Sequence, residues 1–181
     1  MKEFIKDLII AVVIVVAISM VIKPTIVKER SMQPTLYENN YLFVNKLTYK
    51  FKEHPNRGDI VVFKSQLDDD QNGGKKLLIK RVIGVEGDII TIDEGYVYRN
   101  GKKINEPYIK TQGATYDEGT EIVGYQVPED QVFCMGDNRE YSLDSRSADV
   151  GTVSEKKIIG KAFFRLYPFN EIGGLSEYSE K

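Results

Sequence analysis

Three polar segments interrupt a sequence that is otherwise rich in β-branched and aromatic residues. The first, RSMQPT (residues 30–35), carries Ser31. The second, IKRVIGVEGD (residues 79–88), carries Lys80, and the third, GDNREYSLDSRS (residues 136–147), is dense in hydrogen-bonding groups. A serine hydroxyl becomes a good nucleophile when an adjacent base takes its proton, so the chemistry depends on whether these segments meet in the fold.

Lys80 stands inside an apolar, strand-like stretch next to a second cation, Arg81. In a strand these two side chains point to opposite faces, and one face should be buried. Arginine stays protonated and could serve only as a structural cation, whereas desolvation can lower a lysine pKa from ~10.4 by as much as ~3–5 units. Lys80 could therefore be a neutral general base near pH 7. The alternative is an edge strand on which both cations are solvated.

Ser31 and His54 each have a structural interpretation as well. Ser31 lies beside a turn-forming Gln-Pro-Thr sequence, where a serine usually caps or turns the chain. His54 could pair with a serine and an aspartate, but no G-x-S-x-G elbow occurs and polar turn residues flank it, which favours an exposed histidine. With one histidine and one cysteine, Cys134, the chain can form neither an internal disulfide nor a His/Cys metal cluster.

The third polar segment combines acids, arginines and hydroxyl groups at short spacing. Its members are Asp137, Asn138, Arg139, Ser142, Asp144, Ser145 and Arg146. A solvated loop can have this composition. The alternative is a network in which Asp/Arg pairs brace a cleft, because charge-assisted pairs fix geometry.

An apolar segment near the N-terminus precedes these residues. Leu8–Ile22 has no charged side chain, and flanking apolar residues extend it to a complete membrane span from about Phe4 to Val27. Lys6 and Lys23 could place their ammonium groups at the two interfaces. The sequence therefore predicts a membrane anchor over residues 1–28.

Two alternatives to an anchor remain, namely a buried core helix and a cleavable signal peptide. Lys2 and Lys6 would form the basic region of such a peptide, and Ala17–Ser19 resembles its cleavage site. Apolar character continues past Ser19, which favours an uncleaved anchor. Charges on the two sides of the span do not decide its orientation.

The rest of the chain has the pattern of a mainly β domain. Short β-type runs alternate with turns, among them Asp93–Gly95 and the two-residue hairpin turn Asn100–Gly101. The segment from Pro107 to Tyr125 is Gly-rich and weakly periodic, so loops are expected there. The formal net charge of the whole chain is -2, which does not favour binding to nucleic acid.

Together the segments resemble those of type I signal peptidases, the membrane-anchored Ser/Lys endopeptidases that release exported proteins from their signal peptides. Four boxes stand in the family's order: Ser31–Thr35 (SMQPT), Gly58–Phe63 (GDIVVF), Lys80–Asp88 (KRVIGVEGD) and Gly136–Arg146 (GDNREYSLDSR). The resemblance runs from the apolar segment to about Phe169. The short insertion between the second and third boxes and the single anchor resemble the enzymes of Gram-positive-type bacteria.

The resemblance implies a role for each matched residue. Ser31 would be the acyl-forming nucleophile, its backbone N–H would bind the oxyanion, and Lys80 would be its general base. Ser142 would hydrogen-bond and orient the lysine. The residues implied to brace the site are Asp137, Arg139, Asp144 and Arg146. No cofactor and no metal are implied.

The implied architecture is one N-terminal transmembrane helix followed by an antiparallel, barrel-like β catalytic domain. We expect an anchor over residues 1–28, the β domain over 29–175 and a tail over 176–181. The domain would lie on the extracytoplasmic side of the cell membrane, in contact with lipid and with the signal peptides of exported preproteins. The residues expected to line the substrate pockets are Val27, Met32, Ile79 and Val82.

Glu29 departs from the family pattern, which usually has glycine or serine two residues before the nucleophile. An ionised carboxylate accepts hydrogen bonds and cannot donate one to an oxyanion. Facing Lys80, it would also raise the lysine pKa. We therefore expect Glu29 to point toward solvent, paired with Lys28 or Arg30. Two other functions stay open: a non-catalytic, membrane-tethered β binding module and a self-cleaving Ser/Lys protease.

Overall fold

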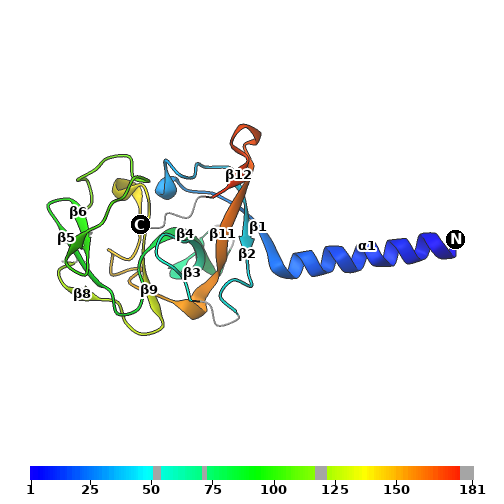
Figure 1. Ribbon diagram of the computed structural model, residues 1–181, viewed down its shortest axis with the longest axis horizontal. Coiled ribbons are helices and arrows are strands. Elements are labelled where there is room, and N and C mark those ends of the chain that lie inside the picture. The colour runs from blue at the N-terminus through cyan, green and yellow to red at the C-terminus, as the bar shows by residue number, and fades with distance from the viewer. Residues whose placement is uncertain (51–53, 71–72, 117–121, 176–181) are drawn as a thin grey trace.

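The computed structural model describes residues 1–50, 54–70, 73–116 and 122–175, and it consists of one long helix and a β body (Figure 1). The helix α1 spans Lys2–Val21. The strands are β1 Ile22–Ile26, β2 Tyr41–Asn45, β3 Ile60–Asp68, β4 Lys75–Gly84, β5 Ile89–Asp93, β6 Tyr96–Arg99, β7 Lys102–Lys103, β8 Tyr125–Gln126, β9 Gln131–Met135, β10 Val153–Ser154, β11 Ile158–Tyr167 and β12 Gly173–Gly174. Four short 3₁₀ helices are η1 Arg30–Met32, η2 Arg139–Tyr141, η3 Glu155–Lys157 and η4 Phe169–Glu171.

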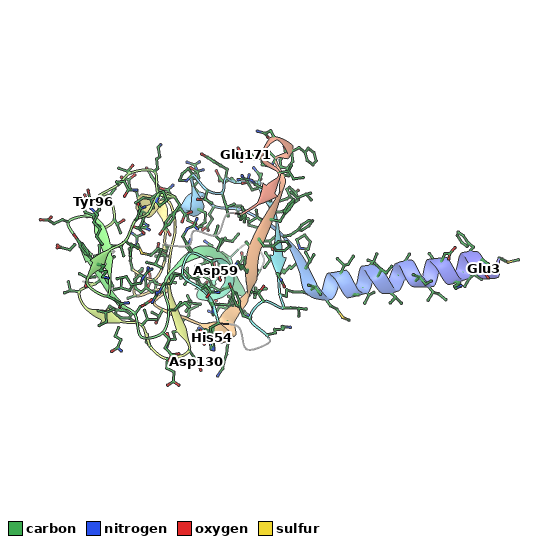
Figure 2. All side chains as sticks on the ribbon, viewed as in Figure 1. Glu3, His54, Asp59, Tyr96, Asp130 and Glu171 are labelled. Atoms are coloured by element: carbon green, nitrogen blue, oxygen red, sulfur yellow. The ribbon has the colours of Figure 1, made fainter. Side chains whose placement is uncertain are left out.

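α1 projects away from the β body, so that Glu3 and Tyr96 lie at opposite ends of the molecule (Figure 2). Its segment Glu3–Val21 has 19 residues, is strongly apolar and is not buried anywhere in the molecule. At ~1.5 Å per residue this length approaches the ~30 Å of a bilayer core. By length and composition, α1 can therefore cross a membrane, and it is not the core helix of a soluble domain.

The expected span to Val27 is too long, because the helix ends at Val21. Pro24 cannot continue a helix and restricts the residue before it. Ile22–Ile26 instead pair with β2 in antiparallel register, from Ile22 opposite Asn45 to Ile26 opposite Tyr41. Residues before the expected domain start at 29 thus already pair with the larger sheet. The expected tail, 176–181, lies outside the described residues.

Lys46, just after β2, holds the C-terminal end of α1. Its ammonium group donates to the Ser19 carbonyl at 2.7 Å, and its backbone N–H donates to the Val21 carbonyl at 2.8 Å. The last carbonyls of a helix have no partner within the helix and carry the negative end of its dipole. A cation at this position satisfies them and ties the helix directly to the sheet.

Antiparallel strands form two sheets, which confirms the mainly β prediction. The larger sheet has the order β1-β2-β11-β3-β4-β9-β10, with β12 paired to β11, and the smaller has the order β7-β6-β5-β8. The predicted turns are present: Asn100 and Gly101 have φ values of 53° and 76°, and Glu94 and Gly95 have values of 47° and 82°. Two successive residues in this left-handed region match the twist of a two-residue hairpin.

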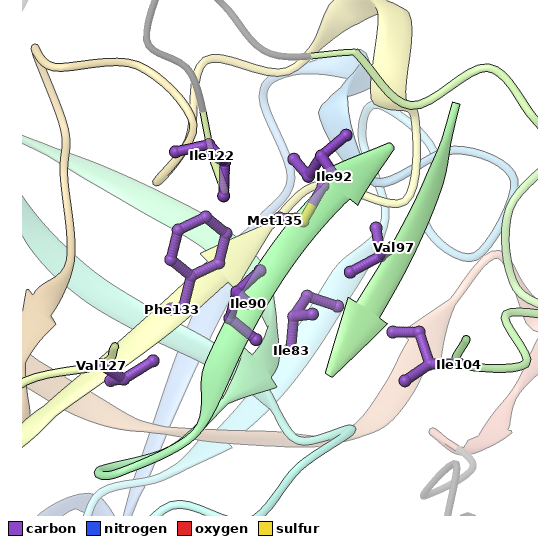
Figure 3. Packing of buried hydrophobic residues seen from close by; sticks show 9 residues of the cluster. All are labelled: Ile83, Ile90, Ile92, Val97, Ile104, Ile122, Val127, Phe133 and Met135. Carbon is purple, nitrogen blue, oxygen red and sulfur yellow. The ribbon is translucent and has the colours of Figure 1, made fainter. Parts of the chain in front are cut away.

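The core consists of three buried apolar clusters. The cluster shown in Figure 3 joins the small sheet to β4 and β9 through Ile83, Ile90, Ile92, Val97, Ile104, Ile122, Val127, Phe133 and Met135. We call the second the η1 cluster; it contains Val27, Met32, Leu36, Leu42, Val44, Ile60, Val62 and Ala162. The third, the β9 cluster, contains Val61, Phe63, Leu78, Val82, Val132, Cys134, Val150 and Val153. Burial of a large apolar side chain contributes about 1.5–3 kcal/mol to folding. Residues of β4 contact all three clusters, so their burial holds this strand in place.

Gly160 in β11 offers a direct test of how closely two strands must approach. A Cβ at this position would lie within 3.0 Å of backbone atoms of Asn45, which cannot move without separating β11 from β2. Gly160→Ala should therefore lower the free energy of unfolding by about 3 kcal/mol. Denaturant unfolding of the full chain in detergent measures this. Gly84→Ala, whose three nearest contacts would be side-chain atoms of Ile90 and Val127, should cost about 1 kcal/mol.

Candidate active site

Ser31 and Lys80 meet in the interior, although 49 positions separate them in the chain. The Lys80 Nζ lies 2.6 Å from the Ser31 Oγ and donates a hydrogen bond to it. Ser31 is 5% exposed and Lys80 is 1% exposed. Among the described residues, this is the one hydrogen bond of the Lys80 ammonium group. The alternative of a solvated edge strand is therefore wrong, and Arg81 is buried as well.

The position of Ser31 follows from the short helix η1 and the apolar residues after it. The Gln33 N–H bonds to the Arg30 carbonyl at 3.1 Å, which closes the turn. Met32 and Leu36 are buried in the η1 cluster, and the Leu36 N–H bonds to the Met32 carbonyl at 2.8 Å. Burial of the residue after Ser31 thus presses the serine against β4.

The third polar segment holds η1 from the other side. The Asn138 N–H donates to the Ser31 carbonyl at 3.0 Å, and the Asn138 side-chain amide donates to the Arg30 carbonyl at 3.1 Å. Both bonds act on the backbone of the nucleophile turn and leave the Ser31 hydroxyl to Lys80. The first and third polar segments therefore form one unit.

Burial lowers the pKa of Lys80 below its usual range, because a charged ammonium loses its water there. Asp144 and Glu29 oppose this shift, since a negative charge favours the protonated lysine, while Lys76 adds to it. Burial is the largest of these effects. Lys80 is thus much closer to giving up its proton near neutral pH than a lysine in water.

Asp144 is the buried acceptor around which the third segment folds. It accepts from the Gly136 N–H at 2.9 Å, from the Ser142 hydroxyl at 2.6 Å and from the Arg146 Nε at 2.9 Å. Arg146 also reaches the carbonyl of Arg139 at 2.8 Å. The side chains of Arg139, Ser142, Asp144 and Arg146 are all buried. The network interpretation of this segment is therefore correct, and the solvated-loop interpretation is wrong.

Ser142 lies at the site but has a different partner from the one expected. Its hydroxyl donates to Asp144, and within the described residues it makes no hydrogen bond with Lys80. The Ser142 hydroxyl donates its hydrogen bond to Asp144 because a buried carboxylate is a strong acceptor. Ser142 thus acts on Lys80 only indirectly, by holding Asp144.

Gly136 allows the closest approach in the site. A Cβ at this position would lie within 3.0 Å of the Ser31 carbonyl oxygen and of the Ser142 side chain. Only glycine lets this backbone pass between the nucleophile turn and the Ser142 loop. A glycine is required at Gly136 because a side chain would not fit there, and not because the backbone has a positive φ.

Asp137 binds the second polar segment to the first. Its carboxylate pairs with Arg81 at 2.8 and 2.6 Å and accepts from the Thr35 hydroxyl at 2.5 Å. Arg81 also donates to the Gly58 carbonyl at 3.0 Å, so it connects the second box as well. Arg81 is the structural cation that the strand pattern allowed, and its forked geometry suits a bidentate carboxylate.

Arg139 has a partner that the sequence did not reveal. Its guanidinium pairs with Glu106, donates to the Thr115 hydroxyl at 2.7 Å and reaches the Gly136 carbonyl at 3.0 Å through Nε. Glu106 lies 33 residues away, next to the segment expected to be a loop. No local pattern signals this pairing, because Glu106 and Arg139 come from different parts of the chain.

Three of the four expected lining residues lie together. Val27 and Met32 are buried in the η1 cluster, and Ile79 packs against it half-buried. Val82 belongs instead to the β9 cluster, because it lies opposite Cys134 in the β4–β9 pairing. The structure therefore does not bring Val82 to the apolar surface beside Ser31.

Glu29 points toward solvent, as expected, but its partner is different. It pairs with Lys76 of β4 at 2.5 Å, and the two side chains are 43% and 40% exposed. Arg30 pairs instead with Glu38 at 3.2 Å. Glu29 makes no hydrogen bond with Lys80 in the described part of the chain.

His54 lies at the edge of the β body, near Asp130 in the view of Figure 2. Its Nδ1 contacts the Glu155 carboxylate at 2.9 Å, and this carboxylate raises the pKa of the exposed imidazole. The expected exposed histidine is confirmed. Within the described residues, no group of three or more His, Cys, Asp or Glu side chains is placed to hold a metal ion.

Comparison with known proteins places this geometry in a family. The profile described as "Signal peptidase, peptidase S26" matches residues 1–167. The protein named signal peptidase I in Bacillus amyloliquefaciens is 38% identical over 176 residues, which is 94% of this chain and 90% of the relative. Signal peptidase I S of Bacillus subtilis is 37% identical over 177 residues, covering 94% and 91%.

A crystal structure of a signal peptidase I from Enterococcus faecalis is 29% identical, covers 60% of this chain and 97% of its own, and has a TM-score of 0.46. The profile extends over most of the chain, and both Bacillus relatives exceed 30% identity over nearly their whole length. The chain therefore belongs to the signal peptidase family, peptidase S26.

Proposed function

We propose that this protein is a membrane-anchored serine endopeptidase that removes signal peptides from exported preproteins, with Ser31 as nucleophile and Lys80 as general base. The observation that carries the assignment is the buried 2.6 Å contact between the Ser31 Oγ and the Lys80 Nζ. Family membership supports the reaction class. Among the described residues, His54 contacts Glu155 and makes no hydrogen bond with Ser31, whose hydroxyl contacts Lys80, so a Ser/His/Asp triad is not formed.

The reaction proceeds in two steps through an acyl-enzyme. Neutral Lys80 accepts the Ser31 proton as Oγ attacks the scissile carbonyl, and the resulting lysinium protonates the leaving amine as the C–N bond breaks. Lys80 then takes a proton from a water molecule as the water attacks the ester, and the lysinium returns this proton to the Ser31 Oγ as the ester bond breaks. Burial supports both steps, because it favours the neutral amine at the start of each.

The Ser31 N–H is the proposed oxyanion donor. Ser31 lies in the first turn of η1, where backbone N–H groups have no acceptor within the helix. Glu29 cannot supply a second donor, because its carboxylate is turned toward Lys76 and accepts hydrogen bonds. The backbone of η1 therefore carries the charge stabilisation that acyl transfer needs.

The substrate would bind as an extended strand beside β4. On one side of β4, residues Lys75–Lys80 pair with β3, whereas β9 begins to pair on the other side only at Arg81. A substrate strand could use this free edge, so that main-chain hydrogen bonds fix its register. Val27, Met32 and Ile79 form the apolar wall next to Ser31 that would accept small side chains.

We place the boundary between anchor and catalytic domain at Val21, with residues 22–175 forming the β domain. The domain would lie on the extracytoplasmic side, where preproteins arrive during export. Support for lipid contact comes from exposed aromatic residues on β2, β11 and η4: Tyr41 contacts Tyr167, which contacts Phe169, with ring centroids 6.0 and 5.4 Å apart. Such side chains prefer the interface of a membrane.

Substitution of the two proposed catalytic residues tests the assignment. Ser31→Ala and Lys80→Ala should each reduce cleavage of a preprotein in detergent by more than about a thousandfold, while both variants still unfold cooperatively as folded proteins. Lys80→Arg should fail equally, because a guanidinium does not give up its proton near pH 7. Gel analysis of preprotein processing measures the rates.

Full activity of both alanine variants would indicate a tethered binding module with a contaminating protease, and it would refute the assignment. A self-cleaving protease would show fragments of its own chain whose appearance depends on Lys80. In the preprotein assay, the wild type should instead release the signal peptide and remain intact.

The pH dependence tests Lys80 as the base. Because burial lowers the Lys80 pKa, kcat/KM should rise with pH along an acid limb whose midpoint lies well below ~10.4. Initial rates with a peptide substrate, measured from pH 5 to pH 11, locate this midpoint. His54→Ala should leave the midpoint unchanged, and a midpoint that moves in that variant would contradict the Ser/Lys assignment.

Gly136→Ala tests the positioning of the nucleophile turn. An added methyl would push the Ser31 carbonyl and Ser142 apart from this backbone, and a displacement of about 1 Å can cost a hundredfold in rate. We expect kcat to fall about that far, with a smaller change in KM. Gly173→Ala, where nothing lies within 4 Å of the added Cβ, serves as the control and should retain wild-type kcat.

A further inference from the structure

An exposed ion pair connects the two segments that supply Ser31 and Lys80. Glu29 lies two residues before Ser31, and Lys76 lies four residues before Lys80 on β4. Their carboxylate and ammonium groups are 2.5 Å apart. By strand alternation, Lys76 lies on the same face of β4 as Lys80. The pair therefore crosses from one catalytic segment to the other.

The backbone at Glu29 is extended, with φ −126° and ψ 162°. Glu29 comes directly before η1, and its negative charge acts on Lys80 in favour of the protonated amine, so the carboxylate lies within electrostatic reach of the base. A long carboxylate side chain at this position could turn inward toward Lys80 or outward toward solvent. The contact with Lys76 holds it outward.

The ionisable groups with the largest effects on the Lys80 pKa are Asp144, Glu29, Cys134 and Lys76. Asp144 is buried and already paired with Arg146. Burial raises the pKa of the Cys134 thiol, so this group stays uncharged near neutral pH. Among these four groups, Glu29 and Lys76 are the two charges on partly exposed side chains, and they act on Lys80 protonation in opposite directions.

We propose that Glu29 and Lys76 form a positioning pair that keeps the Glu29 carboxylate on the outer side of the site, and that their two charges together set the pH range in which Lys80 can act. This inference rests on the proposed Ser31/Lys80 chemistry. It gives the residue that departs from the family pattern a function of its own. Neither residue touches the reacting atoms; both act through Lys80.

Charge-neutral variants of nearly the same size test the pair. The set is Glu29→Gln, Lys76→Gln and the double variant, with Glu38→Gln as the matched control. Glu38 also pairs with a residue of the nucleophile turn, Arg30, yet its carboxylate is not among the charges with the largest effects on Lys80. The acid limb of kcat/KM is measured for each full-length protein in detergent, at low salt and in 1 M NaCl.

At low salt, Glu29→Gln should move the midpoint of the acid limb down by about half a pH unit, because a negative charge that stabilises the lysinium is lost. On the acid limb this equals a roughly threefold faster rate at a given pH. Lys76→Gln should move the midpoint up by at least as much, since it removes a positive charge and releases Glu29. The double variant should return close to the wild-type midpoint.

Salt distinguishes this electrostatic role from a structural one. Both charges are partly exposed, so 1 M NaCl, with a screening length of ~3 Å, should reduce the shifts markedly. Glu38→Gln should leave the midpoint in place at both salt concentrations. The plateau rates at high pH should stay within about twofold of the wild type, because the reacting atoms are unchanged.

Coincident midpoints for the wild type, Glu29→Gln and Lys76→Gln would overturn the inference, and so would shifts of the opposite sign. A lower plateau with an unmoved midpoint would also overturn it, because it would show a purely structural pair. In all these outcomes Ser31→Ala and Lys80→Ala would still be inactive. Activity that survives in those alanine variants would instead refute the proposed function itself, so the two failures are distinguishable.

Discussion

The burial of Lys80 beside Ser31 is the constraint on which the rest of the site depends. A charged ammonium in this position would lose its water, a penalty of the order of several kcal/mol, so the folded protein favours the neutral amine. The unfolded chain then binds more protons between the folded and the unfolded lysine pKa, and stability rises with pH across that window. The burial that lowers the Lys80 pKa for catalysis is therefore the same burial that reduces the stability of the fold when the lysine is charged.

Three buried arginine–carboxylate pairs surround this dry centre: Arg81 with Asp137, Arg139 with Glu106 and Arg146 with Asp144. Such pairs seldom stabilise a fold by much, because desolvation offsets most of their attraction, whereas removal of one partner is costly. Their value here is geometric. Each pair binds backbone carbonyls, N–H groups or hydroxyls of a different segment, so the nucleophile turn, β4 and the Ser142 loop keep one arrangement.

Local chemistry made much of this predictable from the sequence. Asn100–Gly101 specified a hairpin because both residues adopt positive φ. Lys80 in an apolar strand allowed either a buried base or a solvated cation, and the family resemblance favoured the base. Features that depend on distant partners were not visible. Hydropathy extended the predicted span to Val27 because Ile22, Ile26 and Val27 are apolar. The pairing of β1 with β2 shows where the helix gives way to a strand. Glu106 was missed for the same reason, since its partner Arg139 is remote in sequence.

The direct passage from α1 into β1 has a consequence for where the chemistry occurs. No flexible linker follows Val21: β1 pairs with β2 at once, Lys46 holds the helix end, and Val27 is fixed by backbone bonds to Asn39 and Asn40 of 2.8 and 2.9 Å. Ser31 follows four residues later in η1. A chain this short and this fully bonded keeps the nucleophile at a fixed height above the helix end. A membrane-embedded substrate would therefore be selected by the distance of its scissile bond from the bilayer as well as by its side chains.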